Sequence, residues 1–229
     1  MPCILHGIII ILLTIWGDIL KITDICKQKR STERYNIYID DSFSFSALDE
    51  DIIKYNIKIS NEYSKDELND LIKKCEYDKA YEYALKILSI KDFSVNDLRN
   101  KLKTKNYSEY TIKGVTQKLE SYDLLNDEKY ANKLINDSLE FKKNGINKIK
   151  YSLKSHGIEN NIIDNIKIDN KKEYKNAYDI ALKKYKLIEG KGNEKGKLYR
   201  YLSSKGYEYD TIKKVINEII KDADDEELE

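Results

Sequence analysis

The sequence predicts a mainly α-helical protein, in which tandem three-helix repeats stack into an elongated, curved array behind a small N-terminal segment containing a β-hairpin. Two observations carry this prediction. The chain repeats itself at intervals of 51 and then 49 residues, and polar and apolar residues alternate at residues 34–45, ahead of the repeats. A period near 50 residues indicates stacked supersecondary units, each of which buries its apolar face with the help of its neighbours.

The repeat is clearest between residues 98–119 and 198–219, which align without a gap as LRNKLKTKNYSEYTIKGVTQKL and LYRYLSSKGYEYDTIKKVINEI. A weaker middle copy occupies residues 149–166. In the first repeat, apolar residues at helical spacing from Ala80 to Leu88 predict the first helix. Ser94 begins S-V-N-D, a start similar to a capping box, and Ser108 caps the third helix.

The later repeats are expected to follow the same plan. The second repeat starts at Asn126, and its second and third helices follow Gly145 and Gly157. The predicted organisation is an apolar extension at residues 1–19, a β-rich segment at 20–63, a connecting helix at 64–76, repeats at 77–125, 126–169 and 170–221, and an acidic tail at 222–229.

The β-rich segment is predicted from alternation. Residues 34–39 and 42–45 alternate on either side of Asp40–Asp41, which indicates a hairpin, although Asp-Asp is a poorer turn than Asp-Gly. Residues 19–25 could supply a third strand. Short helices are expected near residues 47–55 and 65–75.

The apolar run CILHGIIIILLTIW at residues 3–16 is shorter than the roughly 20 residues that span a membrane. It also lacks the basic start of a signal peptide. We therefore expect residues 1–19 not to belong to the natural protein and Leu20 to be the true start. N-terminal mass spectrometry of the native protein tests this, and a peptide from upstream of Leu20 would contradict it.

Composition indicates a cytoplasmic protein that is not an enzyme. Charged residues make up 35% of the chain, and the net charge of +1 includes six acidic residues at positions 222–229, so residues 1–221 carry +7. The three cysteines, Cys3, Cys26 and Cys75, form no metal or disulfide motif. The glycines at residues 190–196 lack the strand and the G-K-S/T ending of a phosphate loop. We expect no catalytic residue, cofactor or metal.

Four stretches of the chain share their pattern with one known family. They are RYNIYIDDSFSF at residues 34–45, ALKILSIKDFSVNDLRNKLKTK at 84–105, LLNDEKYA at 124–131, and the spaced pattern from Gly145 through Ile149 and Leu153 to His156–Gly157–Ile158. On these residues the chain resembles RecX, the regulatory proteins that modulate the RecA recombinase. The resemblance covers most of residues 20–221. Asn106 departs from the usual glycine, although asparagine tolerates the left-handed conformation.

The resemblance implies a partner and an activity. RecX-like proteins bind in the groove of the filament of RecA on single-stranded DNA. They damp ATP hydrolysis, strand exchange and coprotease activity, and so regulate DNA repair and the SOS response. This implies contact with DNA mainly through RecA, no membrane association and a monomer.

Candidate contact residues come from comparing the repeats. Arg99 and Lys103 lie on one face of the predicted second helix of the first repeat, and Lys150 and Lys154 occupy the matching positions in the second. Such recurring basic pairs suit phosphates or acidic side chains, although a solvated helix face is the simpler interpretation of any single position. Further candidates are Lys142, Lys143, Lys148, Lys195, Lys197 and Arg200.

Three corresponding residues, Lys105, His156 and Lys205, fall at the ends of second helices, where positive charge favours the helix dipole. Two other functions stay open: a DNA-binding helical-repeat protein without sequence preference, which would lose affinity steeply with salt, or a helical scaffold for another protein partner, which would show no dependence on RecA.

Overall fold

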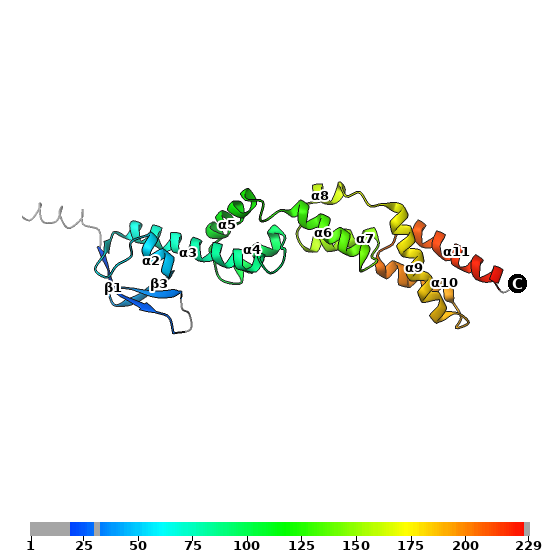
Figure 1. Cartoon of the computed structure of the whole chain (residues 1–229), viewed down its shortest axis with the longest axis horizontal. Coiled ribbons are helices and arrows are strands. Elements are labelled where there is room, and N and C mark those ends of the chain that lie inside the picture. The colour runs from blue at the N-terminus through cyan, green and yellow to red at the C-terminus, as the bar shows by residue number, and fades with distance from the viewer. Residues whose placement is uncertain (1–18, 30–32, 227–229) are drawn as a thin grey trace, which may run out of the picture. The chain divides into compact units, whose positions relative to one another are not determined.

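The computed structural model describes residues 19–29 and 33–226, and these form ten helices and four strands (Figure 1). They divide into two compact units. The first comprises the described residues up to 91 together with residues 99–122, and the second comprises residues 92–98 and those from 123 onward. The predicted apolar extension lies outside the described residues, apart from Ile19. The mainly helical fold with a small N-terminal sheet confirms the predicted fold class.

The first unit begins with an antiparallel sheet of strands β1 (Leu20–Lys27), β2 (Arg34–Ile39), β3 (Ser42–Leu48) and β4 (Glu62–Tyr63), in the order β3-β2-β1-β4. Ile39 pairs with Ser42 across Asp40–Asp41, whose φ angles are 46° and 63°. Positive φ at both central residues is the geometry of a type I′ hairpin turn. The predicted hairpin and third strand are therefore confirmed, whereas the two-residue β4 was not predicted.

One face of this sheet is buried against helices α2 (Asp49–Lys54) and α3 (Lys65–Leu88). Alternate strand residues such as Ile22, Ile37 and Phe45 point into this core and meet Leu71 and Cys75 of α3. Every second side chain of the strands thus packs against the apolar face of α3 in one cluster. This cluster is the main core of the N-terminal part of the chain.

Helix α3 continues through the expected boundary between the connecting helix and the first helix of the first repeat. Its start is fixed by Ser64, whose Oγ accepts the Glu67 N–H while the Glu67 carboxylate accepts the Ser64 N–H at 2.9 Å. Residues 65–88 contain no glycine or proline to end the helix. The connecting segment and the first helix of the repeat are therefore one 24-residue helix.

The first repeat is completed by α4 (Val95–Lys103) and α5 (Glu109–Ser121). Asn106 lies in the turn between them with a φ of 61°, which is the left-handed conformation that glycine or asparagine adopts most easily. Ser108 Oγ accepts the N–H of Thr111 and caps α5, as predicted.

The second unit contains the second and third repeats. The second repeat consists of α6 (Asp127–Glu140), α7 (Ile146–Ser155) and α8 (Asn160–Asp164), and the third of α9 (Asn170–Ile188), α10 (Glu194–Lys205) and α11 (Tyr209–Glu226). Each repeat has its own apolar cluster, centred on Ile149 and Leu153 in one and on Leu198 and Leu202 in the other. The backbone of α11 extends into the predicted acidic tail.

Candidate functional site

The basic pair of the first repeat lies on α4. Arg99 is half-buried, and Lys103 is exposed with its Nζ 2.8 Å from the Glu109 carboxylate at the start of α5. An exposed ion pair of this kind stabilises the fold little, so Lys103 can exchange Glu109 for another anion at small cost. Within the described part of the chain, the Arg99 side chain has no hydrogen-bond or ion-pair partner.

The equivalent pair of the second repeat lies on α7. Lys154 is exposed and Lys150 half-buried, and neither side chain has a hydrogen-bond or ion-pair partner among the described residues. Tyr151, which is 75% exposed, lies next to Lys150 on the same helix. Helix α7 therefore presents two available cations and an exposed ring to solvent.

The lysines before and within the first turn of α7 have contacts inside the protein. Lys143 Nζ donates to Asn176 Oδ1 at 2.6 Å, and Lys148 Nζ donates to the Ser204 carbonyl at 3.2 Å. Lys142 is exposed, and its carbonyl accepts a hydrogen bond from the Lys205 ammonium at 3.4 Å. Lys143 and Lys148 thus hold neighbouring helices together, and Lys142 is the most available of these three candidates.

The remaining candidates lie on α10. Lys195 and Arg200 are exposed and have no hydrogen-bond or ion-pair partner in the described ranges. Lys197 is half-buried and its Nζ donates to the Lys191 carbonyl at 2.9 Å. Lys197 therefore closes the loop that precedes α10, and the other two point cations to solvent.

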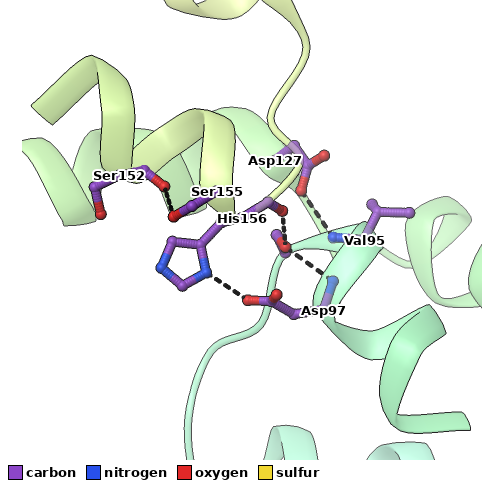
Figure 2. A network of polar contacts seen from close by, with 7 residues as sticks. Val95, Asp97, Asp127, Ser152, Ser155 and His156 are labelled. Carbon is purple, nitrogen blue, oxygen red and sulfur yellow. Dashed lines mark hydrogen bonds and ion pairs between the residues drawn. The ribbon is translucent and has the colours of Figure 1, made fainter.

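Successive repeats are joined where their second helices meet. Figure 2 shows the start of α4 against the end of α7, within the second unit. Ser94 Oγ donates to the His156 carbonyl at 2.6 Å and accepts the Asp97 N–H at 3.1 Å. The Asp97 carboxylate lies 2.7 Å from His156 Nδ1. Asp97 therefore binds the next repeat instead of closing the predicted capping box on Ser94.

The same junction recurs one repeat later, at the start of α7 and the end of α10. The N–H groups of Gly145 and Asn147 donate to the carbonyls of Lys205 and Gly206 at 2.9 and 3.1 Å. The end of the second helix of one repeat thus supplies acceptors to the start of the second helix of the preceding repeat. Without them, the N–H groups at that start would be unpaired. The prediction that the repeats stack is met by these contacts within the second unit.

A carboxylate completes each junction. Asp127 accepts the Val95 N–H at 2.9 Å (Figure 2), and Glu173 accepts the Ile146 N–H at 2.8 Å. Burial raises the pKa of both carboxyl groups, and the hydrogen bonds they accept oppose that rise. Sequence reasoning missed this pair. Its only trace in the sequence is an acidic residue four positions before the buried Ala131 and Ala177.

A second feature missed from the sequence is an aromatic and basic cleft in the first unit. A cleft of about 330 Å³ is lined by three tyrosines, two lysines and one aspartate, which come from α3, from the start of α5 and from the residue that ends α2. They are Tyr55, Asp70, Lys73, Lys74, Tyr77 and Tyr110. The high tyrosine content of the chain masked any signal from these positions, because 19 tyrosines are distributed throughout the sequence.

The described residues form neither a metal-binding cluster nor a membrane-spanning helix. No group of three or more histidine, cysteine or carboxylate side chains there is arranged to hold a metal ion. None of the helices in the same ranges has the length and apolar character needed to cross a membrane.

Comparison with known proteins identifies the family. Residues 20–63 match the regulatory protein RecX N-terminal domain, residues 80–119 the first RecX three-helix domain, and residues 172–216 the third. The chain is 37% identical over 205 residues to the regulatory protein RecX of Clostridium perfringens strain SM101, covering 87% of this chain and 96% of that protein. It is equally similar to the RecX of Clostridioides difficile strain 630, covering 87% and 95%.

Solved structures agree on the fold. The crystal structure of a regulatory protein RecX superposes with a TM-score of 0.63 at 23% identity, covering 86% of this chain and 99% of the other. The crystal structure of RecX from Lactobacillus salivarius superposes with a TM-score of 0.57 at 27% identity, covering 63% and 96%. The similarity in sequence extends over nearly the whole length of the clostridial proteins, and this chain belongs to the RecX family of regulatory proteins.

Proposed function

We propose that this chain binds the filament that RecA forms on single-stranded DNA and inhibits ATP hydrolysis, strand exchange and coprotease activity there. It would thereby regulate DNA repair and the SOS response. The observation that supports this most directly is family membership over almost the full length of the relatives, which are named regulatory proteins. The protein acts by binding, as a cytoplasmic monomer without a cofactor.

The repeated junctions suit a partner made of identical subunits. In the second unit, successive repeats are joined by equivalent hydrogen bonds, so equivalent side chains recur at regular steps along the chain. Several weak contacts made at once by linked modules bind far more tightly than any one of them. A junction fixed before binding also reduces the entropy lost when the complex forms.

The basic faces of α4 and α7 are the proposed contacts. Arg99, Lys150 and Lys154 have no partner within the described residues, and Lys103 has only an exposed one. Guanidinium and ammonium groups left available in this way can pair with carboxylates of RecA or with phosphates of the strand. Lys142, Lys195 and Arg200 are further proposed contacts on the second unit.

The test is the steady-state ATPase rate of the cognate RecA on single-stranded DNA while this protein is titrated. We expect the rate to fall at or below a stoichiometric ratio of this protein to RecA. An unchanged rate at saturating protein would overturn the proposed inhibition. A parallel titration of DNA-free RecA separates inhibition of the filament from an effect on RecA alone.

A further inference from the structure

The cleft on the first unit combines ring faces with cations. Tyr77 of α3, Tyr55 from the end of α2 and Tyr110 from α5 all line it. Tyr110 is 77% exposed, whereas the other two rings are half-buried. Three aromatic side chains from three elements thus converge on one opening, and the most exposed of them stands at the first turn of α5.

Lysine side chains cover the same rings. Lys118 Nζ lies 5.8 Å from the Tyr77 ring centroid and 4.5 Å from that of Tyr81. Lys74 Nζ lies 6.0 Å from the Tyr55 centroid. These distances are typical of cation–π contacts. Neither ammonium has a carboxylate partner in the described part of the chain, so Lys74 in the cleft lining and Lys118 beside the Tyr77 ring are both cations that no anion neutralises.

The acidic residues nearby are already engaged. Asp70 pairs with Lys73 at 3.4 Å with both side chains exposed, and Asp78 accepts hydrogen bonds from Lys54 and Tyr55. The exposed pair is weak and frees Lys73 readily for a stronger anion. With one aspartate and two lysines in its lining and Lys118 beside the Tyr77 ring, the cleft region carries an excess of positive charge.

The Tyr77 ring in the cleft lining is closely packed against its neighbours. A Cβ atom at Gly114 of α5 would lie 3.1 Å from the Tyr77 ring, so the absence of a side chain there lets the ring lie directly against α5. Tyr77 also stacks on Tyr81, with ring planes 6° apart. The Tyr77 ring is therefore held in place before any ligand arrives, which reduces the entropy lost on binding.

We propose that this cleft binds single-stranded nucleic acid directly, with a base stacked on Tyr110 and phosphates held by Lys73, Lys74 and Lys118. Unstacked bases offer the flat faces that exposed rings bind, and the flanking phosphates match the excess of positive charge. An acidic protein surface would satisfy the lysines but leave the rings unused. Paired bases in a duplex cannot present their faces to the rings. This goes beyond the proposed function, because the strand is held by this chain without RecA.

The experiment is fluorescence anisotropy of a labelled oligodeoxythymidylate with the full chain and no RecA. Tyr110→Leu removes the ring but keeps an apolar side chain. Tyr209→Leu is its matched control, since Tyr209 is 61% exposed in the first turn of α11, on the second unit. Lys74→Glu is paired with Lys86→Glu, an exposed residue of the same helix outside the cleft. An abasic strand of equal length and polyglutamate serve as ligands with charge but no bases.

We expect Tyr110→Leu and Lys74→Glu each to weaken binding about tenfold or more, and both controls to bind as the wild type does. The abasic strand should bind more weakly than the oligodeoxythymidylate, and polyglutamate should not displace it. Equal affinity for the abasic strand, displacement by polyglutamate, an unaffected Tyr110→Leu variant or no binding at all would each overturn the proposal. RecA inhibition is measured separately, so its failure is distinguishable from failure of the cleft.

Discussion

Asp127 and Glu173 occupy equivalent positions in two successive repeats, and each carboxylate accepts the backbone N–H of the first residue in the preceding repeat's second helix. The distances are 2.9 Å from Val95 N to Asp127 and 2.8 Å from Ile146 N to Glu173. The first N–H group of each of these helices is thus capped by a side chain of the next repeat. The same hydrogen bond therefore caps the helix and joins the two repeats.

The cap supplied by Glu173 should depend on its oxygen and not on its charge. Glu173→Ala leaves the Ile146 N–H without its acceptor, and we expect a loss of about 1–3 kcal/mol in the free energy of unfolding. Glu173→Gln retains an acceptor oxygen and removes a carboxyl group whose ionised form is disfavoured by burial, so it should cost little at pH 7. Urea unfolding followed by circular dichroism gives both values. Equal losses in the two variants would show that the hydrogen bond is not what stabilises the junction.

Gly206 is the tightest point of the junction between the second and third repeats. A Cβ atom there would lie 2.4 Å from the backbone N and the Cβ of Lys148, and φ is +87°. Gly190 also has positive φ, +69°, but nothing lies within 4 Å of its Cβ position. Both Gly→Ala variants incur the cost of a left-handed alanine, roughly 1–2 kcal/mol.

Only Gly206→Ala must also displace α7, which adds about 1–3 kcal/mol. We therefore expect its unfolding midpoint in urea to fall well below that of Gly190→Ala. Similar midpoints for the two variants would contradict the close approach at Gly206. Gly157→Ala, whose Cβ would lie 2.5 Å from Asn96, should behave like Gly206→Ala.

The sequence predicted those elements whose signals are local. The alternation on either side of Asp40–Asp41 marked the hairpin, and the serine at position 108 marked the start of α5. The prediction divided α3 between a connecting helix at 64–76 and a repeat that begins at 77, although no glycine or proline ends the helix within 65–88. Strand β4 has only two residues, which is too short for an alternation of polar and apolar residues to predict a strand.

Contacts between distant segments were not predictable in the same way. Ser94 and Asp97 read as a local capping box, but in the structure both bind His156, about 60 positions away. The intramolecular partners of the basic candidates were not predictable for the same reason. Lys148 was a further candidate because it lies in a cluster of lysines, whereas its hydrogen bond to the Ser204 carbonyl depends on how α7 and α10 dock.

Asp51 should make the first unit sensitive to pH. Its side chain is 1% exposed, accepts the Leu48 N–H at 3.0 Å, and has its pKa raised to about 6 by burial. Burial alone would also raise the pKa of Asp78, but hydrogen bonds from Lys54 and Tyr55 outweigh it and hold that pKa below its ordinary value. The two neighbouring carboxyl groups therefore ionise at different pH.

An Asp51 pKa above its unfolded value of about 4 means that the native state binds the proton more tightly. The stability contributed by Asp51 is then present below pH 4 and is lost as pH rises to about 6. Asp51→Asn removes this dependence and keeps an acceptor oxygen. Its free energy of unfolding relative to the wild type should rise by about 2 kcal/mol between pH 4 and pH 7. Urea titrations at both pH values test this, and a difference that does not change with pH would count against a buried, protonated Asp51.

The basic faces of α4 and α7 can be tested without disturbing the cores. We expect Arg99→Glu combined with Lys150→Glu to raise the concentration of this protein needed for half-inhibition of the RecA ATPase by about tenfold or more, because two attractive contacts become repulsive. Neither side chain has an intramolecular hydrogen-bond or ion-pair partner in the described ranges, so the helical circular-dichroism signal should not change. By contrast, Leu98→Ala or Leu102→Ala would remove fully buried side chains, and lost activity would then report unfolding.

The matched control is Lys86→Glu with Lys183→Glu, which reverses one exposed lysine on each unit away from the proposed faces. It makes the same change in net charge, so any general electrostatic effect on a polyanionic filament appears in both double variants. Weaker inhibition by the first double variant alone locates the contact on α4 and α7. If both variants weaken inhibition equally, net charge governs binding, and if neither does, Arg99 and Lys150 lie outside the surface that contacts the filament.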